Sequence, residues 1–162
     1  MAESARELII SAALSTRIKK FDEIELEGRR RRNNCAYFDG KSCCKFKLPS
    51  KNTLLASWVY DNHFIPHPVL CFICPYYSIK KEGGNENNKV TLDIIEFYSY
   101  YSSIKDKLER EVNILSSRVS DFILGGSILF RRRREEILIY LEDIKRKLEI
   151  LKELIVFEQT LK

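Results

Sequence analysis

Apolar residues in the second half of the chain recur every three or four positions, the spacing that places them on one face of a helix. Two such stripes are separated by Gly125 to Ser127, where glycine suits a helix C-terminus and serine a helix N-terminus. The stripes align with each other if the chain reverses there, so residues 89–162 are predicted to form an antiparallel coiled-coil hairpin. A homodimer that uses the same faces is the alternative. The first stripe runs through Ile94, Phe97, Tyr101, Ile104, Leu108, Val112, Leu115, Val119 and Phe122, and the second through Ile137, Leu141, Ile144, Leu148, Leu151 and Ile155.

The first part of the chain carries a shorter helical pattern. Apolar residues at helical spacing over residues 2–21 predict an N-terminal helix. The acidic and then basic stretch that follows, with Gly28 as a break, reads as a connector. From Cys35 the apolar period changes to two, and Asp39-Gly40 favours a two-residue turn, so a β-hairpin is expected there.

Prolines and a polar loop punctuate the middle of the chain. Residues 49–77 are predicted to be irregular, with one short helix around Leu54 to Val59. A glycine- and asparagine-rich stretch then ends near residue 88. We predict a mainly α fold with a small cysteine-rich α+β metal module: residues 1–34 form the helix and basic connector, 35–88 the metal-binding module, and 89–162 the coiled-coil hairpin.

Five cysteines lie within forty residues, which is the strongest chemical signal in the chain. Cys71 and Cys74 form a C-x-x-C pair, and Cys35 pairs with one of the adjacent Cys43 and Cys44 across the expected turn. Two separated pairs supply the four thiolates that tetrahedral zinc requires. The segments CAYFDGKSCC and CFICPYY resemble small zinc-ribbon or zinc-knuckle modules in a general way, which implies a structural zinc ion.

The ligand set has alternatives. A two-residue turn places Cys35 opposite Cys44 and favours Cys44, while a longer turn transfers the role to Cys43. An iron-sulfur cluster also uses four thiolates, and Pro after Cys74 is found in ferredoxin motifs. Free thiols or disulfides are the remaining alternative, and His63 or His67 can replace a thiolate.

The net charge is +5, and the chain contains two runs of four arginines, the second within a half of the chain that is neutral overall. A run of guanidinium groups favours an anionic partner, phosphate above all. The first run adjoins the metal module, so RNA or DNA contact is expected from Arg29, Arg30, Arg31, Arg32, Lys45 and Lys47.

The second run follows an apolar hairpin tip. This combination fits a protein groove or the surface of an anionic membrane, and pairing with nearby carboxylates is the plainer interpretation of the arginines. The residues expected at this partner surface are Phe122, Ile123, Leu124, Leu129, Phe130, Arg131, Arg132, Arg133 and Arg134.

The chain contains no motif typical of an enzyme. It has no glycine-rich phosphate loop, no H-E-x-x-H and no nucleophile beside a plausible base. With no apolar run of about 20 residues, the expected location is cytoplasmic. One glutamine and one methionine favour a thermophilic source. We expect a non-enzymatic, metal-stabilised protein that binds nucleic acid and carries a coiled-coil arm for a second partner. The alternatives are a coiled-coil adaptor or membrane-surface protein and an iron-sulfur redox protein.

Overall fold

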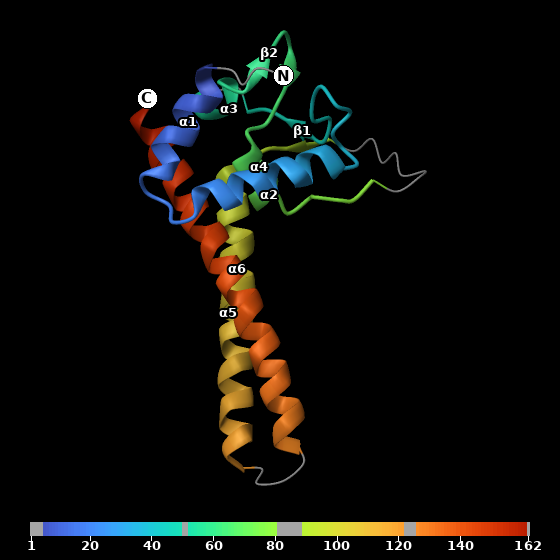
Figure 1. Ribbon diagram of the computed structural model, residues 1–162, viewed down its shortest axis with the longest axis vertical. Helices are drawn as coiled ribbons and strands as arrows, with labels where there is room; N and C mark the ends of the chain where they lie inside the picture. Colours follow the sequence, from blue (N-terminus) through green and yellow to red (C-terminus); the bar gives the residue numbers. More distant parts are fainter. Residues whose placement is uncertain (1–4, 50–51, 81–88, 122–125, 162) are drawn as a thin grey trace. The chain divides into compact units, whose positions relative to one another are not determined.

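The computed structural model describes residues 5–49, 52–80, 89–121 and 126–161 (Figure 1). Over this part the protein is mainly helical, with six helices and four strands of two residues each. Internal contacts divide the chain into two compact units. The first comprises Met1–Phe97 and Ile150–Lys162, and the second comprises Tyr98–Glu149. Each unit is described separately below.

Two helices, and not one, form the N-terminal part of the first unit. Helix α1 spans Ala5–Ser15, and α2 spans Phe21–Asn34. Lys20 between them has a positive φ of 58°, which ends the helical path before α2 begins. The predicted single helix over 2–21 is therefore too long, and the predicted connector is a helix. Glu25, Glu27 and the following arginines pair along α2, so the charged stretch supports a helix.

Helix α2 packs closely against α4, which spans Pro68–Ile73 (Figure 1). A Cβ atom at Gly28 would lie 2.0 Å from the carbonyl oxygen of Pro68, so only glycine allows this approach. Pro68 occupies the first turn of α4, and the His67 ring caps the helix by accepting a hydrogen bond from the Val69 N–H. The sequence pattern did not reveal α4.

The strands form two small pairs. Strand β1 (Phe46–Lys47) lies parallel to β4 (Val90–Thr91), and β2 (Val59–Tyr60) lies antiparallel to β3 (His63–Phe64). Asp61 and Asn62, the two residues between β2 and β3, both have positive φ, as a type I′ turn requires. The chain therefore makes its two-residue hairpin turn here and not at Asp39-Gly40.

Helix α3 spans Thr53–Ala56, close to the short helix predicted in this region. Its N-terminus is held from the far end of the chain, because the buried carboxylate of Glu158 accepts hydrogen bonds from the N–H groups of Thr53 and Leu54. Trp58 follows α3 and is fully buried. The C-terminal residues of the chain therefore complete the core of the first unit.

The second unit contains most of two long helices, α5 (Ile94–Asp121) and α6 (Gly126–Thr160). The predicted helices in this half of the chain are confirmed, and they lie side by side and antiparallel in this unit (Figure 1). Leu115, Ile137 and Leu141 form a buried cluster between them, and Leu108, Val112 and Phe130 pack against it. Within the described part of the chain, no helix combines the length and apolar character needed to span a membrane.

Candidate metal centre

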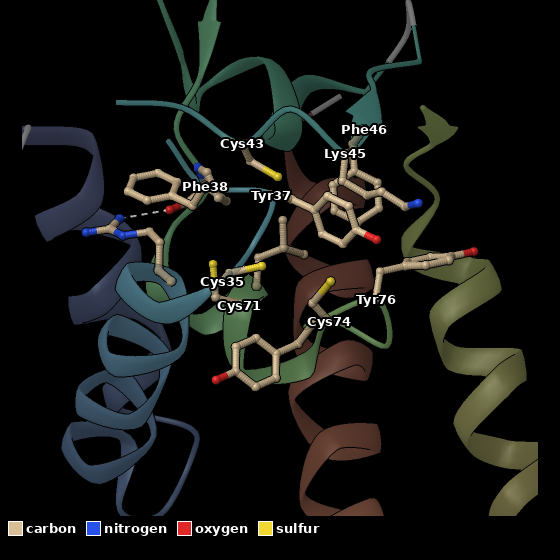
Figure 2. Close-up of a pocket in the computed structure, with 13 residues that line it drawn as sticks. Cys35, Tyr37, Phe38, Cys43, Lys45, Phe46, Cys71, Cys74 and Tyr76 are labelled. Atoms are coloured by element: carbon tan, nitrogen blue, oxygen red, sulfur yellow. Dashed lines mark hydrogen bonds between the residues drawn. The ribbon is translucent and has the colours of Figure 1, made fainter. Parts of the chain in front are cut away.

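Four cysteines border one cavity in the first unit. Cys35, Cys43, Cys71 and Cys74 line one cavity of about 30 Å³. Figure 2 shows Cys43 on one side of this space and the other three cysteines on the opposite side. All four are free thiols. Cysteines from distant segments of the chain therefore border the same cavity.

The four cysteines come from three different segments. Cys35 is the C-terminal cap of α2, and Cys74 is the C-terminal cap of α4. Cys71 lies within α4, one turn before Cys74. Cys43 lies after a loop and forms a backbone bridge with Phe38. Because α2 packs on α4, the contact between these helices brings three of the thiols together.

The loop before Cys43 decides which of the two adjacent cysteines faces the cavity. Phe38 pairs with Cys43 and Cys35 pairs with Ile79, so the predicted pairing of Cys35 with Cys44 is wrong. The Asp39 carboxylate accepts hydrogen bonds at 2.8 Å from the N–H groups of Lys41 and Ser42, which widens the turn. Cys44 is exposed and its thiol donates to the carbonyl of Tyr37 instead.

Burial favours the protonated form of three of the cavity thiols. It raises the pKa of Cys43 to about 11 and that of Cys74 to about 12, and it raises the pKa of Cys71 as well. Negative charge on Cys35 also raises the pKa of Cys43, Cys71 and Cys74, which places the four thiols in one electrostatic cluster. A bound metal cation reverses this effect, because it favours the thiolate form.

The thiols surround a space and do not form a ready single-ion site. In residues 5–49, 52–80, 89–121 and 126–161, no group of three or more His, Cys, Asp or Glu side chains is arranged to hold a metal ion. The zinc prediction therefore stays a prediction.

Two cations and several aromatic rings complete the wall of the cavity. Arg32 and Lys45 both line it. The Lys45 ammonium lies 4.7 Å from the centre of the Tyr37 ring and 5.4 Å from that of Tyr76 (Figure 2). The Arg32 guanidinium lowers the pKa of Cys71, which opposes the effect of burial. The sequence analysis predicted that Arg32 and Lys45 contact phosphate. Both residues lie close to a cysteine in the chain, and this spacing was a signal that they line the same cavity.

The first arginine run makes internal contacts. Arg29 pairs with Glu25, while Arg30 and Arg31 share Glu27. The Arg31 guanidinium also donates to the Phe72 carbonyl, and Arg32 donates to the carbonyl of Pro66. Of the six residues predicted to bind nucleic acid, Lys45 is buried, whereas Arg30 and Lys47 are exposed.

The two histidines do not line the cavity. His67 is fully buried between Phe21 and Trp58, and its Nε2 lies 2.9 Å from the Ser11 hydroxyl. Its Nδ1 accepts the capping hydrogen bond of α4, so both ring nitrogens have protein partners. His63 is exposed on β3. The structure gives both histidines positions outside the thiol cluster.

The predicted apolar tip is described only in part. Phe122, Ile123 and Leu124 lie outside the described residues. Leu129 is 71% exposed, whereas Phe130 packs against the buried cluster of the second unit. The second arginine run, Arg131 to Arg134, is exposed along α6.

Comparison with known proteins returns no relative: no protein-family model, curated protein or solved structure matches the chain.

Proposed function

We propose that this chain is a metal-stabilised binding protein whose metal centre is held by Cys35, Cys43, Cys71 and Cys74. The observation that carries the proposal is that these four thiols, from three segments, line a single cavity. Four thiolates carry more negative charge than one divalent ion neutralises, and Arg32 and Lys45 on the same wall supply positive charge. Cys43 replaces Cys44 as our proposed fourth ligand because Cys44 is exposed and lies outside the cavity lining.

The proposed centre has a structural role. It joins the C-terminal ends of α2 and α4 to the loop that carries Cys43, and a bound metal adds its binding free energy to folding.

Metal content and stability test the proposal together. The full chain is purified without oxygen and its bound metals are measured, and its thermal unfolding is then compared before and after treatment with a chelator. We expect a metal-loaded protein whose melting temperature falls on chelation. Protein that carries no metal, and whose melting temperature changes neither with a chelator nor after incubation with zinc or with iron and sulfide, would contradict the proposal.

The two long helices are proposed to continue their pairing as an antiparallel coiled coil. The buried cluster of Leu115, Ile137 and Leu141 supports this pairing, and so does the ion pair of 3.4 Å between Arg133 and Glu111 across the helices. Such an arm presents its outward faces to a partner.

Nucleic-acid binding is a second candidate function, and the exposure of Arg131 to Arg134 on α6 favours it. Arg133 and Arg134 contact Glu111 and Ser116 across the hairpin, but exposed pairs of this kind are weak and exchange readily with phosphate. The first arginine run is less suited to this role because its side chains contact the first unit itself.

A charge-matched pair of variants tests this candidate. Arg131→Gln with Arg132→Gln removes two charges from the run, and Lys145→Gln with Arg146→Gln removes two exposed charges elsewhere on α6. We expect the first double variant to weaken RNA or DNA binding and to reduce the slope of log K against log salt by about two. The second should leave the slope unchanged. Equal losses in both variants, or no binding by the unmodified protein, would exclude a specific role for the run.

A further inference from the structure

The first turns of α6 carry exposed apolar side chains next to a run of cations. Ile128 is 69% exposed and Leu129 is 71% exposed. The arginines from Arg131 to Arg134 follow in the same helix, and all four are exposed. Residues three and four positions apart are neighbours on a helix, so each apolar side chain lies beside arginines one turn further along. This surface therefore combines apolar side chains with positive charge.

A surface hollow lies between α5 and the same stretch of α6. Ser116 of α5 and Arg131, Arg134 and Glu135 of α6 line it, and its volume is about 310 Å³. Binding sites for small molecules have volumes of about 300–1,000 Å³, so the hollow has room for a phosphate headgroup. The Ser116 hydroxyl accepts a hydrogen bond of 3.0 Å from Nε of Arg134, which holds this guanidinium at the hollow. Its terminal N–H groups can still donate to an anion.

The two arginines at the hollow differ in their ion pairs from the two between them. Arg132 and Arg133 each approach Glu136 at 4.0 Å, and Arg133 also lies 3.4 Å from Glu111. Among the side chains that the structure describes, Arg131 and Arg134 form no ion pair, not even with Glu135 at the same hollow. A phosphate group supplies the negative charge and the oxygen acceptors that two guanidinium groups bind well.

The apolar pair decides which phosphate-bearing partner fits this surface best. A nucleic-acid backbone supplies phosphate but no hydrocarbon phase for Ile128 and Leu129. The surface of an anionic membrane supplies both, because hydrocarbon begins directly below the layer of lipid phosphates. Basic residues beside such a surface are attracted to it, and apolar side chains among them enter the boundary between headgroups and acyl chains.

We propose that the start of α6 binds the surface of an anionic membrane. A lipid phosphate occupies the hollow at Arg131 and Arg134, and Ile128 and Leu129 enter the acyl boundary. All of these residues belong to the second unit, so the inference does not depend on the proposed metal centre. It uses arginines that the nucleic-acid candidate also uses, and the experiment below separates the two partners.

Co-sedimentation of the full chain with vesicles tests the role of charge. We expect binding to vesicles of phosphatidylcholine with phosphatidylserine, and much weaker binding to phosphatidylcholine alone. An arginine near an anionic surface contributes about fivefold in affinity, so Arg131→Gln with Arg134→Gln should weaken binding about 25-fold. Lys145→Gln with Arg146→Gln, at two exposed positions later in α6, should keep most of the binding. Equal losses in the two charge variants would overturn the role of the hollow.

The apolar pair has a matched control on the same helix. Ile128→Ser with Leu129→Ser should weaken vesicle binding about tenfold or more, because two apolar side chains no longer leave water. Leu138→Ser with Ile139→Ser changes another adjacent pair, 37% and 73% exposed, and should alter vesicle binding little. Thermal unfolding of each variant checks that the chain is folded.

Binding of single-stranded RNA by the same proteins separates a membrane from a nucleic acid. Loss of Ile128 and Leu129 should leave RNA binding unchanged, because phosphate contacts need only the charges. No binding to either kind of vesicle, with or without RNA binding, would overturn the membrane proposal. Vesicle binding that needs no phosphatidylserine, or that survives loss of the apolar pair, would overturn it as well.

Discussion

Substitution of Gly28 tests the packing on which the candidate metal centre depends. Gly28→Ala adds a Cβ atom 2.0 Å from the Pro68 oxygen and 2.6 Å from the Pro68 carbonyl carbon. The first distance falls about 1.4 Å short of the 3.4 Å at which ordinary contact begins. Both neighbouring atoms belong to the backbone of α4, so neither can move aside without displacing that helix.

The cost follows from two opposing effects. Overpacking of a tight contact costs about 1–3 kcal/mol, and rigid backbone neighbours favour the upper end of this range. Alanine is better than glycine inside a helix by about 1 kcal/mol, which offsets part of the loss. We expect a net destabilisation of about 2 kcal/mol, which corresponds to a fall of about 4–8 °C in melting temperature for a chain of this size.

The assay is thermal and urea unfolding of Gly28→Ala beside a control on the same helix. Asn33→Ala also replaces a poor helix former, but the Asn33 side chain is exposed. The control should change stability by less than about 0.5 kcal/mol. Because α2 ends at Cys35 and α4 carries Cys71, separation of these helices should also lower the metal content of the Gly28 variant. A Gly28→Ala protein as stable as the unmodified chain would refute the argument for close packing.

Three further predictions concern charged groups of the first unit. Glu158→Gln should lower the free energy of unfolding by about 1–3 kcal/mol in urea titration, because its carboxylate accepts two backbone N–H groups of α3; an unchanged midpoint would contradict this role. The hydrogen bonds from Arg30 lower the pKa of Glu27 from its ordinary value of 4.5 to about 2. The ionised Glu27 carboxylate therefore stabilises the folded chain fully above pH 4.5, and this stabilisation disappears as the pH falls through about 2. The stability difference between the unmodified chain and Glu27→Gln should therefore shrink over that interval, and a difference that is constant with pH would refute the pairing. Arg31→Lys should lower the free energy of unfolding, measured by urea titration, by about 1–2 kcal/mol, because lysine cannot donate to Glu27 and to the Phe72 carbonyl while stacking on the Phe72 ring. The matched variant Arg30→Lys, at an exposed site, should change the free energy of unfolding little.

Local sequence patterns were sufficient for the helices of the second half. Apolar spacing of three and four fixes which face of α5 and α6 is buried, and Leu115, Ile137 and Leu141 lie on the predicted stripes. The short helix near Leu54 followed from the prolines on either side. Such features depend on residues near one another in the chain, so the sequence alone determines them.

Packing between distant segments decided the remaining features. Gly28 looked like a helix break, but it lies inside α2 because the backbone of α4 passes directly over it. Cys43 and not Cys44 faces the cavity because Asp39 widens the preceding turn, and Cys35 pairs with Ile79 instead of a neighbour across a hairpin. Arg31 and Arg32 turn inward because α4 and the segment before it supply carbonyl groups, and α4 a ring, for them. Each outcome depends on which surfaces meet after folding, and the local pattern around a residue does not contain that information.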